Sequence, residues 1–344
     1  MGPLLFEPDL KERIWGGEKL KNLYGKKTPF KHTGESWEVA CHENGASVIA
    51  AGPFKGLTLC ELLQTHSPQI LGEGYEQGNK FPLLIKIIDA KEDLSVQVHP
   101  DDAYAYRIEN GELGKSEAWV VMEAEEDARL IIGLKKGTTQ EAFIEALGAN
   151  QLEKVLNEIV VKPGDVFNIP AGLIHAIGKG ILLAEVQQNS DTTYRVYDWN
   201  RIGLDGQSRD LHVDKSKETI DFLDTYSTLP IHGAKIMRVN AKHTHYILNQ
   251  YFALETIEID GLDKQRNENG YEIYMVLEGS GQLEGEHEFI EVKKGDSLLI
   301  PATCIEYTFC GKIKLLKTYV PKSVEETLKK LEAKGVHKEA IRIQ

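Results

Sequence analysis

Four side chains that could bind a metal ion lie on or next to short apolar segments in the first part of the chain. They comprise an amide, two imidazoles and a carboxylate: Gln97, His99, Glu117 and His175. Imidazole nitrogens with carboxylate and amide oxygens suit zinc or another first-row divalent ion. Gln97 and His99 are two residues apart on an expected strand over 94–102, so they share one face. Because residues from separate strands of a β-barrel can point to one centre, the sequence predicts a metal site. The alternative is a set of separately hydrogen-bonded polar side chains.

Two lysines accompany this set. Lys115 lies two residues before Glu117 and shares its face of an expected strand over 115–122. That position favours a proton-transfer role, with a solvated loop lysine as the alternative. Lys86 stands alone in the apolar segment 81–90, where an unpaired charge would be costly. It either faces a cavity or lies at an edge, with its stem on apolar surface and its ammonium group in water.

His175 ends a segment whose pattern is repeated later in the chain. In 162–178 a Lys-Pro-Gly-Asp turn precedes a short apolar strand, a Pro-Ala-Gly turn follows, and the histidine comes three residues after that turn. The segment 294–306 has the same Gly-to-Pro spacing and carries Glu306 at the position of His175. The turn would fix the direction in which the histidine points.

A second pair of matching segments lies upstream of each copy. Residues 116–123 match 271–278, which places Glu117 over Glu272. Two matches in the same order indicate an internal duplication of short strands separated by Gly and Pro turns. The sequence therefore predicts a mainly β fold of two jelly-roll barrels with a few peripheral helices.

The two copies are expected to differ in function. The first keeps its polar residues, whereas the second loses nearly all of them, with a polar loop over 261–270 and a surface pair, His243 and His245. Residues 1–238 would form the metal-binding barrel with its N-terminal strands and a helical insertion. Residues 239–344 would form a degenerate barrel with a C-terminal helix.

Helices are expected at four places. Three Ser/Thr-x-x-Glu capping boxes mark helix starts at Thr58, Thr138 and Ser323. The helix from Thr138 is expected to occupy 138–159, and a charged helix is expected near 214–224.

Composition argues against several classes of partner. A net charge of −13 disfavours nucleic acid and membrane surfaces, so an anionic substrate needs a local basic pocket. No apolar run is long enough to cross a bilayer, and residues 1–15 lack the basic start and apolar core of a secretory signal. The four cysteines are scattered, so we expect reduced thiols and a cytoplasmic location.

The motifs together resemble a known family. The pattern Gly-x5-Pro-x-Gly-x2-His, which ends at His175, is similar to the second sequence motif of the cupin superfamily. The wider set of motifs resembles type I mannose-6-phosphate isomerase in its short bacterial form. These motifs are IWGG at 14–17, ESWE at 35–38, and the longer segments 85–102, 114–121, 166–180 and 189–199.

This resemblance implies a cofactor, a reaction and two catalytic residues. One zinc ion per chain would be held by the four residues named first, and mannose 6-phosphate and fructose 6-phosphate would interconvert through an enediol. Arg195, in a Ser-Asp-x-x-x-Arg motif, would be the active-site arginine. Lys115 matches a lysine proposed for catalysis in the family. The alternative for Arg195 is a structural salt bridge with Asp191 or Asp198.

Three further residues are expected at the substrate: Lys86, Ser95 and Asp191. Lys86 would be a second candidate for the phosphate group beside Arg195. Thr192 stands where the family usually has Asn, and Tyr194 precedes the arginine. These two departures bear on how the loop shapes sugar specificity.

Two other readings of the same residues stay open at this point. Two histidines and a carboxylate on a barrel also describe non-haem iron oxygenases. A two-barrel cupin could also be a non-catalytic sugar-binding module. The amide ligand Gln97 and the basic pair Lys115 and Arg195 favour a sugar phosphate as the substrate.

Overall fold

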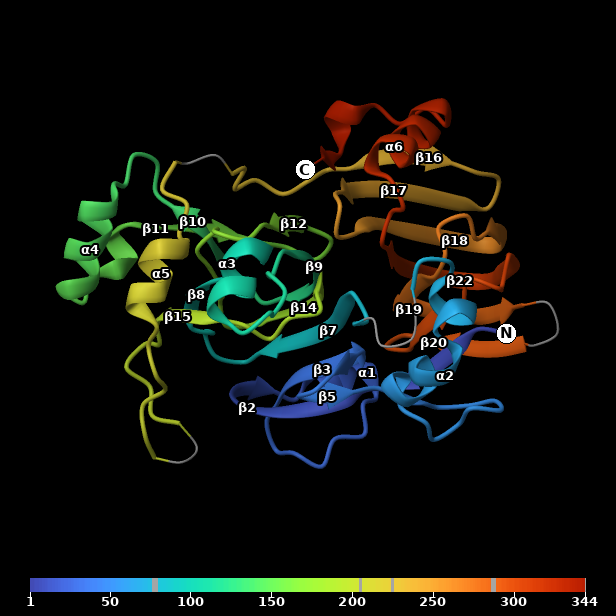
Figure 1. Ribbon diagram of the computed structural model, residues 1–344, viewed down its shortest axis with the longest axis horizontal. Coiled ribbons are helices and arrows are strands. Elements are labelled where there is room, and N and C mark those ends of the chain that lie inside the picture. The colour runs from blue at the N-terminus through green and yellow to red at the C-terminus, as the bar shows by residue number, and fades with distance from the viewer. Residues whose placement is uncertain (76–79, 204–205, 224–225, 286–288, 344) are drawn as a thin grey trace.

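The strands of the molecule form two lobes that lie side by side (Figure 1). The computed structural model describes residues 1–75, 80–203, 206–223, 226–285 and 289–343. The fold is mainly β with peripheral helices, as predicted.

The first lobe consists of two sheets that pack against each other. The order of the six-stranded sheet is β12 (Val166–Ile169), β9 (Glu117–Ala124), β14 (Ile181–Gln188), β7 (Leu83–Ala90), β2 (Asp9–Gly17) and β3 (Thr33–Val39). The order of the five-stranded sheet is β11 (Leu156–Val160), β10 (Arg129–Leu134), β13 (His175–Ile177), β8 (Val96–Val98) and β15 (Tyr194–Tyr197). Buried side chains from both sheets, including Trp119, Phe167 and Leu130, form the core between them.

The second lobe is built on one ten-stranded sheet. Its main path is β16 (Ala234–Met237), β17 (Ala241–Leu248), β18 (Ala253–Arg266), β22 (Glu306–Tyr319), β19 (Glu272–Glu284), β21 (Ser297–Ile300), β1 (Leu4–Glu7) and β6 (Val48–Ile49). Beside this path, β20 (Phe289–Lys293) pairs with β19 and β23 (Arg342–Ile343) pairs with β17. The N-terminal strand β1 therefore belongs to the second lobe. The boundary between 1–238 and 239–344 stays a prediction.

Helices and one small hairpin surround the sheets. The helices are α1 (Lys19–Tyr24), α2 (Leu59–Leu71), α3 (Asp102–Ile108), α4 (Gln140–Gly148), α5 (Val213–Thr219) and α6 (Val324–Ala333). The hairpin joins β4 (Cys41–His42) to β5 (Gly45–Ala46). The predicted capping box of α2 is confirmed, because Thr58 and Glu61 each accept a hydrogen bond from the other's backbone N–H. Ser323 likewise caps α6.

The expected helix over 138–159 is wrong in its start and its length. Thr139 is the N-cap of α4, while the Thr138 hydroxyl donates to the Lys135 carbonyl at 2.7 Å. The helix ends at Gly148, and a short 3₁₀ turn (Leu152–Lys154) leads into β11. Glycine is a weak helix former, so the apolar residues beyond it follow the β-strand.

The strand registers confirm the internal duplication for one of its two matched positions. Glu117 lies opposite Ile169 in the pair β9–β12, and Glu272 lies opposite Ile300 in the pair β19–β21. The match of His175 with Glu306 is wrong, because the Glu306 side chain is 75% exposed. A shift of one residue directs the next side chain, Tyr307, inward, where its hydroxyl donates to Glu272.

The expectation of a polar loop over 261–270 is wrong for most of that segment. The segment 261–270 is not a loop throughout, because β18 continues to Arg266. Its residues Asp263 and Gln265 are buried although they are polar, and this polar strand looked like a loop in sequence.

The pair His243 and His245 is not a surface pair. His243 is 3% exposed and lies 3.4 Å from a Glu255 oxygen and 3.2 Å from an Asp263 oxygen. These acidic partners are on β18, which is distant in sequence and adjacent in the sheet. The second lobe therefore has a polar interior of its own.

The cysteines correct one further expectation. Cys41 and Cys60 form a disulfide between β4 and α2, with their Cα atoms 5.0 Å apart. Their wide separation in sequence hid this proximity, so the expectation of four reduced thiols is wrong. No helix in the described part of the chain is long and apolar enough to span a membrane. The cytoplasmic location stays a prediction.

Candidate metal centre and active site

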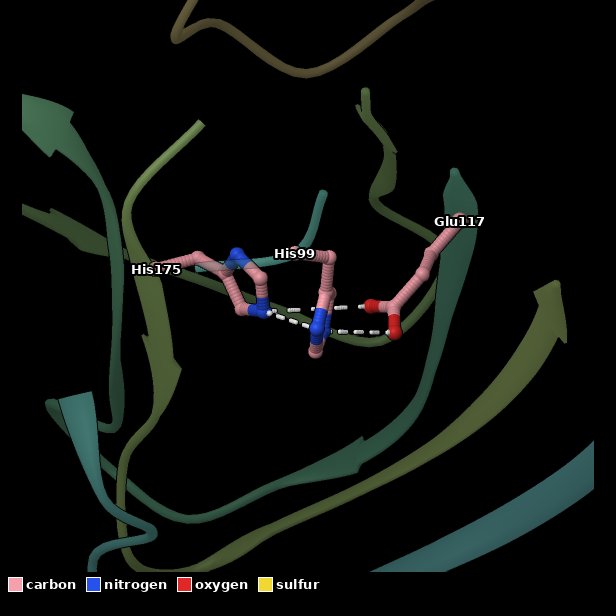
Figure 2. A group of neighbouring side chains, drawn as sticks. All are labelled: His99, Glu117 and His175. Atoms are coloured by element: carbon pink, nitrogen blue, oxygen red, sulfur yellow. Dashed lines mark hydrogen bonds and ion pairs between the residues drawn. The ribbon is translucent and has the colours of Figure 1, made fainter. Parts of the chain in front are cut away.

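Two imidazoles and a carboxylate converge inside the first lobe (Figure 2). His99 directly follows β8, whereas Glu117 and His175 are the first residues of β9 and β13. The two Nε2 atoms of the histidines are 3.1 Å apart, and Glu117 Oε1 is 3.1 Å from His99 Nε2. Glu117 Oε2 is 4.0 Å from His175 Nε2. All three side chains are buried, so three of the four predicted ligands do meet at one centre.

Backbone carbonyls orient both rings. Nδ1 of His99 lies 3.0 Å from the Thr192 carbonyl, and Nδ1 of His175 lies 2.8 Å from the Leu173 carbonyl. A carbonyl only accepts hydrogen bonds, so each Nδ1 carries the proton and each Nε2 presents a lone pair. Two lone pairs and a carboxylate that face one another repel unless a cation lies between them. The donor set therefore fits a divalent metal ion, with the outer hydrogen bonds that metal-ligating histidines usually have.

The charges around the centre agree with this tautomer. Burial, together with the positive charge of Lys115, lowers the pKa of His99 to about 3, so the ring is neutral. Burial alone would raise the pKa of Glu117, but the positive charge of Lys115 holds it well below its usual range. Neutral imidazoles and an ionised carboxylate are the forms that bind metal.

The turn before His175 is tied to the other histidine. Gly172 adopts a φ of 85°, a conformation that strongly favours glycine, and its N–H donates to the His99 carbonyl at 2.9 Å. The predicted role of the Pro-Ala-Gly turn in directing His175 thus has a structural basis.

Gln97 lies beside the centre and is the middle residue of a row that crosses β13, β8 and β15. It is directly opposite His175 in the pair β13–β8 and opposite Arg195 in the pair β15–β8. Residues opposite each other in antiparallel strands point to the same face. Gln97 Nε2 is 3.3 Å from His175 Nε2, and a half-turn of the amide would present its oxygen instead.

The two lysines near the centre are both buried. Lys115 Nζ is 3.2 Å from Glu117 Oε1, and the residue is 4% exposed, so Lys115 is not a solvated loop lysine. Lys86 Nζ contacts Gln187 Oε1 at 2.7 Å and Glu185 at 3.1 Å. Lys86 therefore faces the interior and is paired, and it is not at an edge.

Glu185 is a site residue that the sequence argument missed. The Trp119 indole N–H donates to Glu185 and to Glu117, each at 3.0 Å. Burial, together with the nearby Glu117 charge, raises the pKa of Glu185. The available signal was a single carboxylate within the apolar strand β14, which pairs directly with the Lys86 strand.

The remaining predicted residues lie around this centre. Arg195 Nη1 donates to the Asp210 carbonyl at 2.9 Å, while its buried Nε has no hydrogen-bond partner in the part of the chain described. Asp198 pairs with Arg201 and Arg209 at 2.8 and 2.6 Å, so a structural salt bridge with Arg195 is not what the structure shows.

Ser95 and Asp191 differ in their exposure. Ser95 is buried, two residues before Gln97. Asp191 is exposed and accepts a hydrogen bond from Asn44 Nδ2 at 3.1 Å. Burial alone would lower the pKa of Lys86, but nearby carboxylates raise it. Glu185 and Glu35 have the larger effects, and Asp191 adds to them.

Family models match both lobes. Residues 4–145 match the model of the phosphomannose isomerase type I catalytic domain, and residues 242–320 match that of the mannose-6-phosphate isomerase cupin domain. These matches favour an isomerase over an iron oxygenase or a non-catalytic module. They also confirm the predicted cupin fold.

Individual relatives cover nearly the whole chain. Mannose-6-phosphate isomerase ManA of Bacillus subtilis is 41% identical over 309 residues, which are 90% of this chain and 96% of the relative. The mannose-6-phosphate isomerase of Streptococcus mutans is 37% identical, over 92% of this chain and 98% of its own. A crystal structure of the mannose 6-phosphate isomerase from Bacillus subtilis superposes with a TM-score of 0.88 and 36% identity, covering 93% of this chain and 100% of that one. The chain is an enzyme of the type I phosphomannose isomerase family.

Proposed function

We propose that the enzyme interconverts mannose 6-phosphate and fructose 6-phosphate at the first lobe, with one zinc ion per chain. The observation that supports this most directly is the pair of Nε2 lone pairs facing each other beside Glu117, with Lys115 3.2 Å from that carboxylate. The relatives are named for this reaction. His99, Glu117 and His175 would hold the ion, with the Gln97 amide oxygen as the fourth ligand. A bound zinc ion supplies Lewis acidity toward the carbonyl and hydroxyl oxygens of the sugar.

The chain's own residues would move the proton. Isomerisation transfers a proton between C1 and C2 through an enediol and needs a base close to both carbons. Lys115 is buried beside the proposed ligand Glu117, so its Nζ would reach sugar atoms held at the metal and, after losing its own proton, could accept the proton from carbon. Water is largely excluded there, which strengthens every charge interaction with the substrate.

Arg195 would stabilise the negative oxygen of the intermediate. It lies opposite Gln97, so its side chain leaves the sheet on the same face as the proposed ligands, where C1 and C2 would be held. The phosphate on C6 would be farther away. A guanidinium stays charged at any physiological pH, and the buried Nε of Arg195 has a hydrogen bond to give.

The other predicted residues would shape the pocket. Ser95 would line it from the strand that carries Gln97, and Asp191 at the surface would accept hydrogen bonds from sugar hydroxyls. Lys86 would bind the substrate while it stays paired with Glu185. The same ion pair would hold the Glu185 carboxylate in place beside Trp119.

Metal analysis combined with a coupled assay tests this function. Purified protein should contain about one zinc ion per chain and convert mannose 6-phosphate to fructose 6-phosphate. Chelation should remove the zinc and the activity together, and added zinc should restore both. Full activity after complete metal removal would refute the proposal.

A further inference from the structure

The second lobe contains a cavity of about 810 Å³ that is separate from the metal centre. Residues of β17, β18 and β22, together with residues of α6, line it. These elements lie on the right side of Figure 1. The volume lies within the range of about 300–1,000 Å³ that is usual for small-molecule sites. None of the first-lobe residues discussed above is among its lining residues.

Buried charges form the floor of this cavity. Lys317 Nζ is 2.8 Å from Glu272 and 3.5 Å from Glu255, and Glu255 is 3.3 Å from His245 Nδ1. Lys317, Glu255 and Glu272 are all at most 5% exposed. Burying charges costs free energy that apolar packing would not cost. A lobe that served only as a scaffold would not need these residues.

The floor occupies the same place in the fold as the polar network beside the metal centre. In the first lobe Lys86 lies opposite Glu185, and in the second lobe Glu255 lies opposite Lys317. Glu185 lies opposite Trp119, two residues after Glu117, and Lys317 lies opposite Tyr274, two residues after Glu272. The ion pair is therefore retained at the corresponding strand positions with its charges exchanged.

The imidazole of the metal centre has been replaced in the second lobe. Tyr307 lies opposite Gln265, as His175 lies opposite Gln97. The Tyr307 ring is 6.0 Å from the Tyr274 ring, and the His175 ring is 5.3 Å from the Trp119 ring. The second lobe thus keeps a carboxylate, an amide and an ion pair but has a phenol at this ligand position. Such a site suits the binding of hydroxyl groups without a metal.

Two groups on the floor can bond to a ligand. Burial lowers the pKa of His245, so its ring is neutral, and Nδ1 faces Glu255. In the described part of the chain, its Nε2 has no hydrogen-bond partner and can accept one. Burial raises the pKa of Tyr319, so its hydroxyl stays protonated; that hydroxyl also has no partner among the described residues. One acceptor and one donor on a polar floor match the hydroxyls of a polyol.

Cations surround the opening. Three of the five are paired: Arg238 with Asp263 at 3.2 Å, Arg266 with Glu306 at 3.8 Å and Lys330 with Glu268 at 3.6 Å. The other two, Lys264 and Lys334, are exposed and form no ion pair within the described ranges. One carboxylate of the lining, Glu284, is also exposed and forms no ion pair within the described ranges. The two unpaired lysines outnumber it, and in a chain with a net charge of −13 this local excess of positive charge indicates a site for an anion.

We propose that this cavity binds a small phosphorylated polyol, with its hydroxyls at His245 and Tyr319 and its phosphate at Lys264 and Lys334. This second site goes beyond the reaction at the first lobe, because it needs neither the metal nor turnover. Glucitol 6-phosphate is a suitable probe, since it has the hydroxyls and the phosphate but no carbonyl that could isomerise.

Calorimetric titration of the full-length, metal-loaded protein with glucitol 6-phosphate tests the site. In the double variant Lys264→Glu/Lys334→Glu, one binding event should be at least tenfold weaker than in the unsubstituted protein. The matched control Lys312→Glu/Lys322→Glu reverses two exposed lysines of the same lobe that do not line the cavity, and should keep every binding event. Identical isotherms for the two double variants would refute the proposal.

A second variant tests the polyol part. Tyr319→Phe removes only a hydroxyl, so it should weaken glucitol 6-phosphate binding at this site about three- to tenfold and leave the binding of inorganic phosphate unchanged. If inorganic phosphate binds the unsubstituted protein as tightly as glucitol 6-phosphate does, the polyol assignment is wrong.

The coupled assay separates this site from the function proposed above. Isomerisation by Lys264→Glu/Lys334→Glu at saturating mannose 6-phosphate should remain within twofold of the unsubstituted protein. Loss of the binding event with activity retained supports the second site. Absence of activity in all proteins, with the binding difference intact, would refute the isomerase proposal and support the second site.

Discussion

Arg195 lies directly opposite Gln97 across the antiparallel pair β8–β15, so both side chains point to the same face of the sheet. Gln97 is in turn opposite His175 on its other side. The arginine is therefore in one row with two of the predicted ligands, and this is why the proposed function assigns it to the reacting carbons and not to the phosphate.

Arg195→Lys should lower kcat more than it raises KM. Lysine keeps the charge but loses the planar group that holds two hydrogen bonds in fixed geometry. Losing one donor to a developing oxyanion typically costs about 10²–10³ in kcat, so a fall of at least about tenfold is expected even with the charge retained. Steady-state kinetics on mannose 6-phosphate give both constants. A large rise in KM with kcat unchanged would instead assign Arg195 to the phosphate.

Lys115→Ala should abolish turnover and leave the zinc content intact. General acid–base groups typically contribute about 10²–10⁴ in rate, and Lys115 contacts the ligand Glu117 without being a ligand itself. Metal analysis and the coupled assay, run on the same preparation, measure both properties. The variant Lys91→Ala, in which an exposed lysine is removed, is the control. Activity near normal in Lys115→Ala would remove this residue from the mechanism.

Lys86→Met should destabilise the first lobe strongly. It leaves Glu185 buried without its cation, and breaking a buried ion pair from one side typically costs about 3–5 kcal/mol. The double variant Lys86→Met/Glu185→Leu removes both charges and should recover much of that loss. Urea unfolding of the metal-free proteins measures the free energies. Equal stability of the single and double variants would show that the pair is not coupled.

The ionised Glu35 side chain should stabilise the fold, and this stabilisation should be lost as the pH falls into the acid range. Burial alone would raise the pKa of this β3 residue, but Lys86 and Arg13 hold it at about 2, against 4.5 in the unfolded chain. The stabilisation is complete above pH 4.5, declines as the pH falls, and is lost below about pH 2. A shift of this size corresponds to on the order of 3 kcal/mol.

The variant Glu35→Gln isolates this effect. Its free energy of unfolding should change less between pH 5 and pH 3 than that of the unsubstituted protein, with both stripped of metal. Glu12→Gln, at an exposed position of β2, should behave like the unsubstituted protein. A slope that is the same in all three would contradict the assigned pKa.

The sequence was sufficient to predict that His99, Glu117 and His175 converge, because their positions depend on local rules. Alternation along β8 and the residue after it places Gln97 and His99 on one face, and a Pro-Ala-Gly turn precedes His175. The repeat then indicated which of the two barrels would carry them. The same local rules predicted the caps of α2 and α6.

The parts that could not be predicted depend on contacts between distant segments. Glu185 is recognised as a site residue only when β14 lies beside β9, and the Cys41–Cys60 disulfide only when β4 lies beside α2. The second lobe shows the same limit. Its polar strand looked like a loop, because its buried residues face other polar residues and not an apolar core. The one-residue shift at Tyr307 then altered which side chain takes the place of His175.

The pairing of β1 with β21 affects how the chain can fold during synthesis. Leu4 pairs with Leu299, so β1 is translated long before β21 and most other strands of the same sheet. Until then β1 has unpaired backbone groups and apolar side chains exposed to other chains. Completion of the second lobe has to await release of the C-terminal strands, and contacts between segments this distant in sequence form slowly. Strands β1 and β23 thus lie in one sheet although more than 300 residues separate them, so deleting either strand would weaken the same lobe.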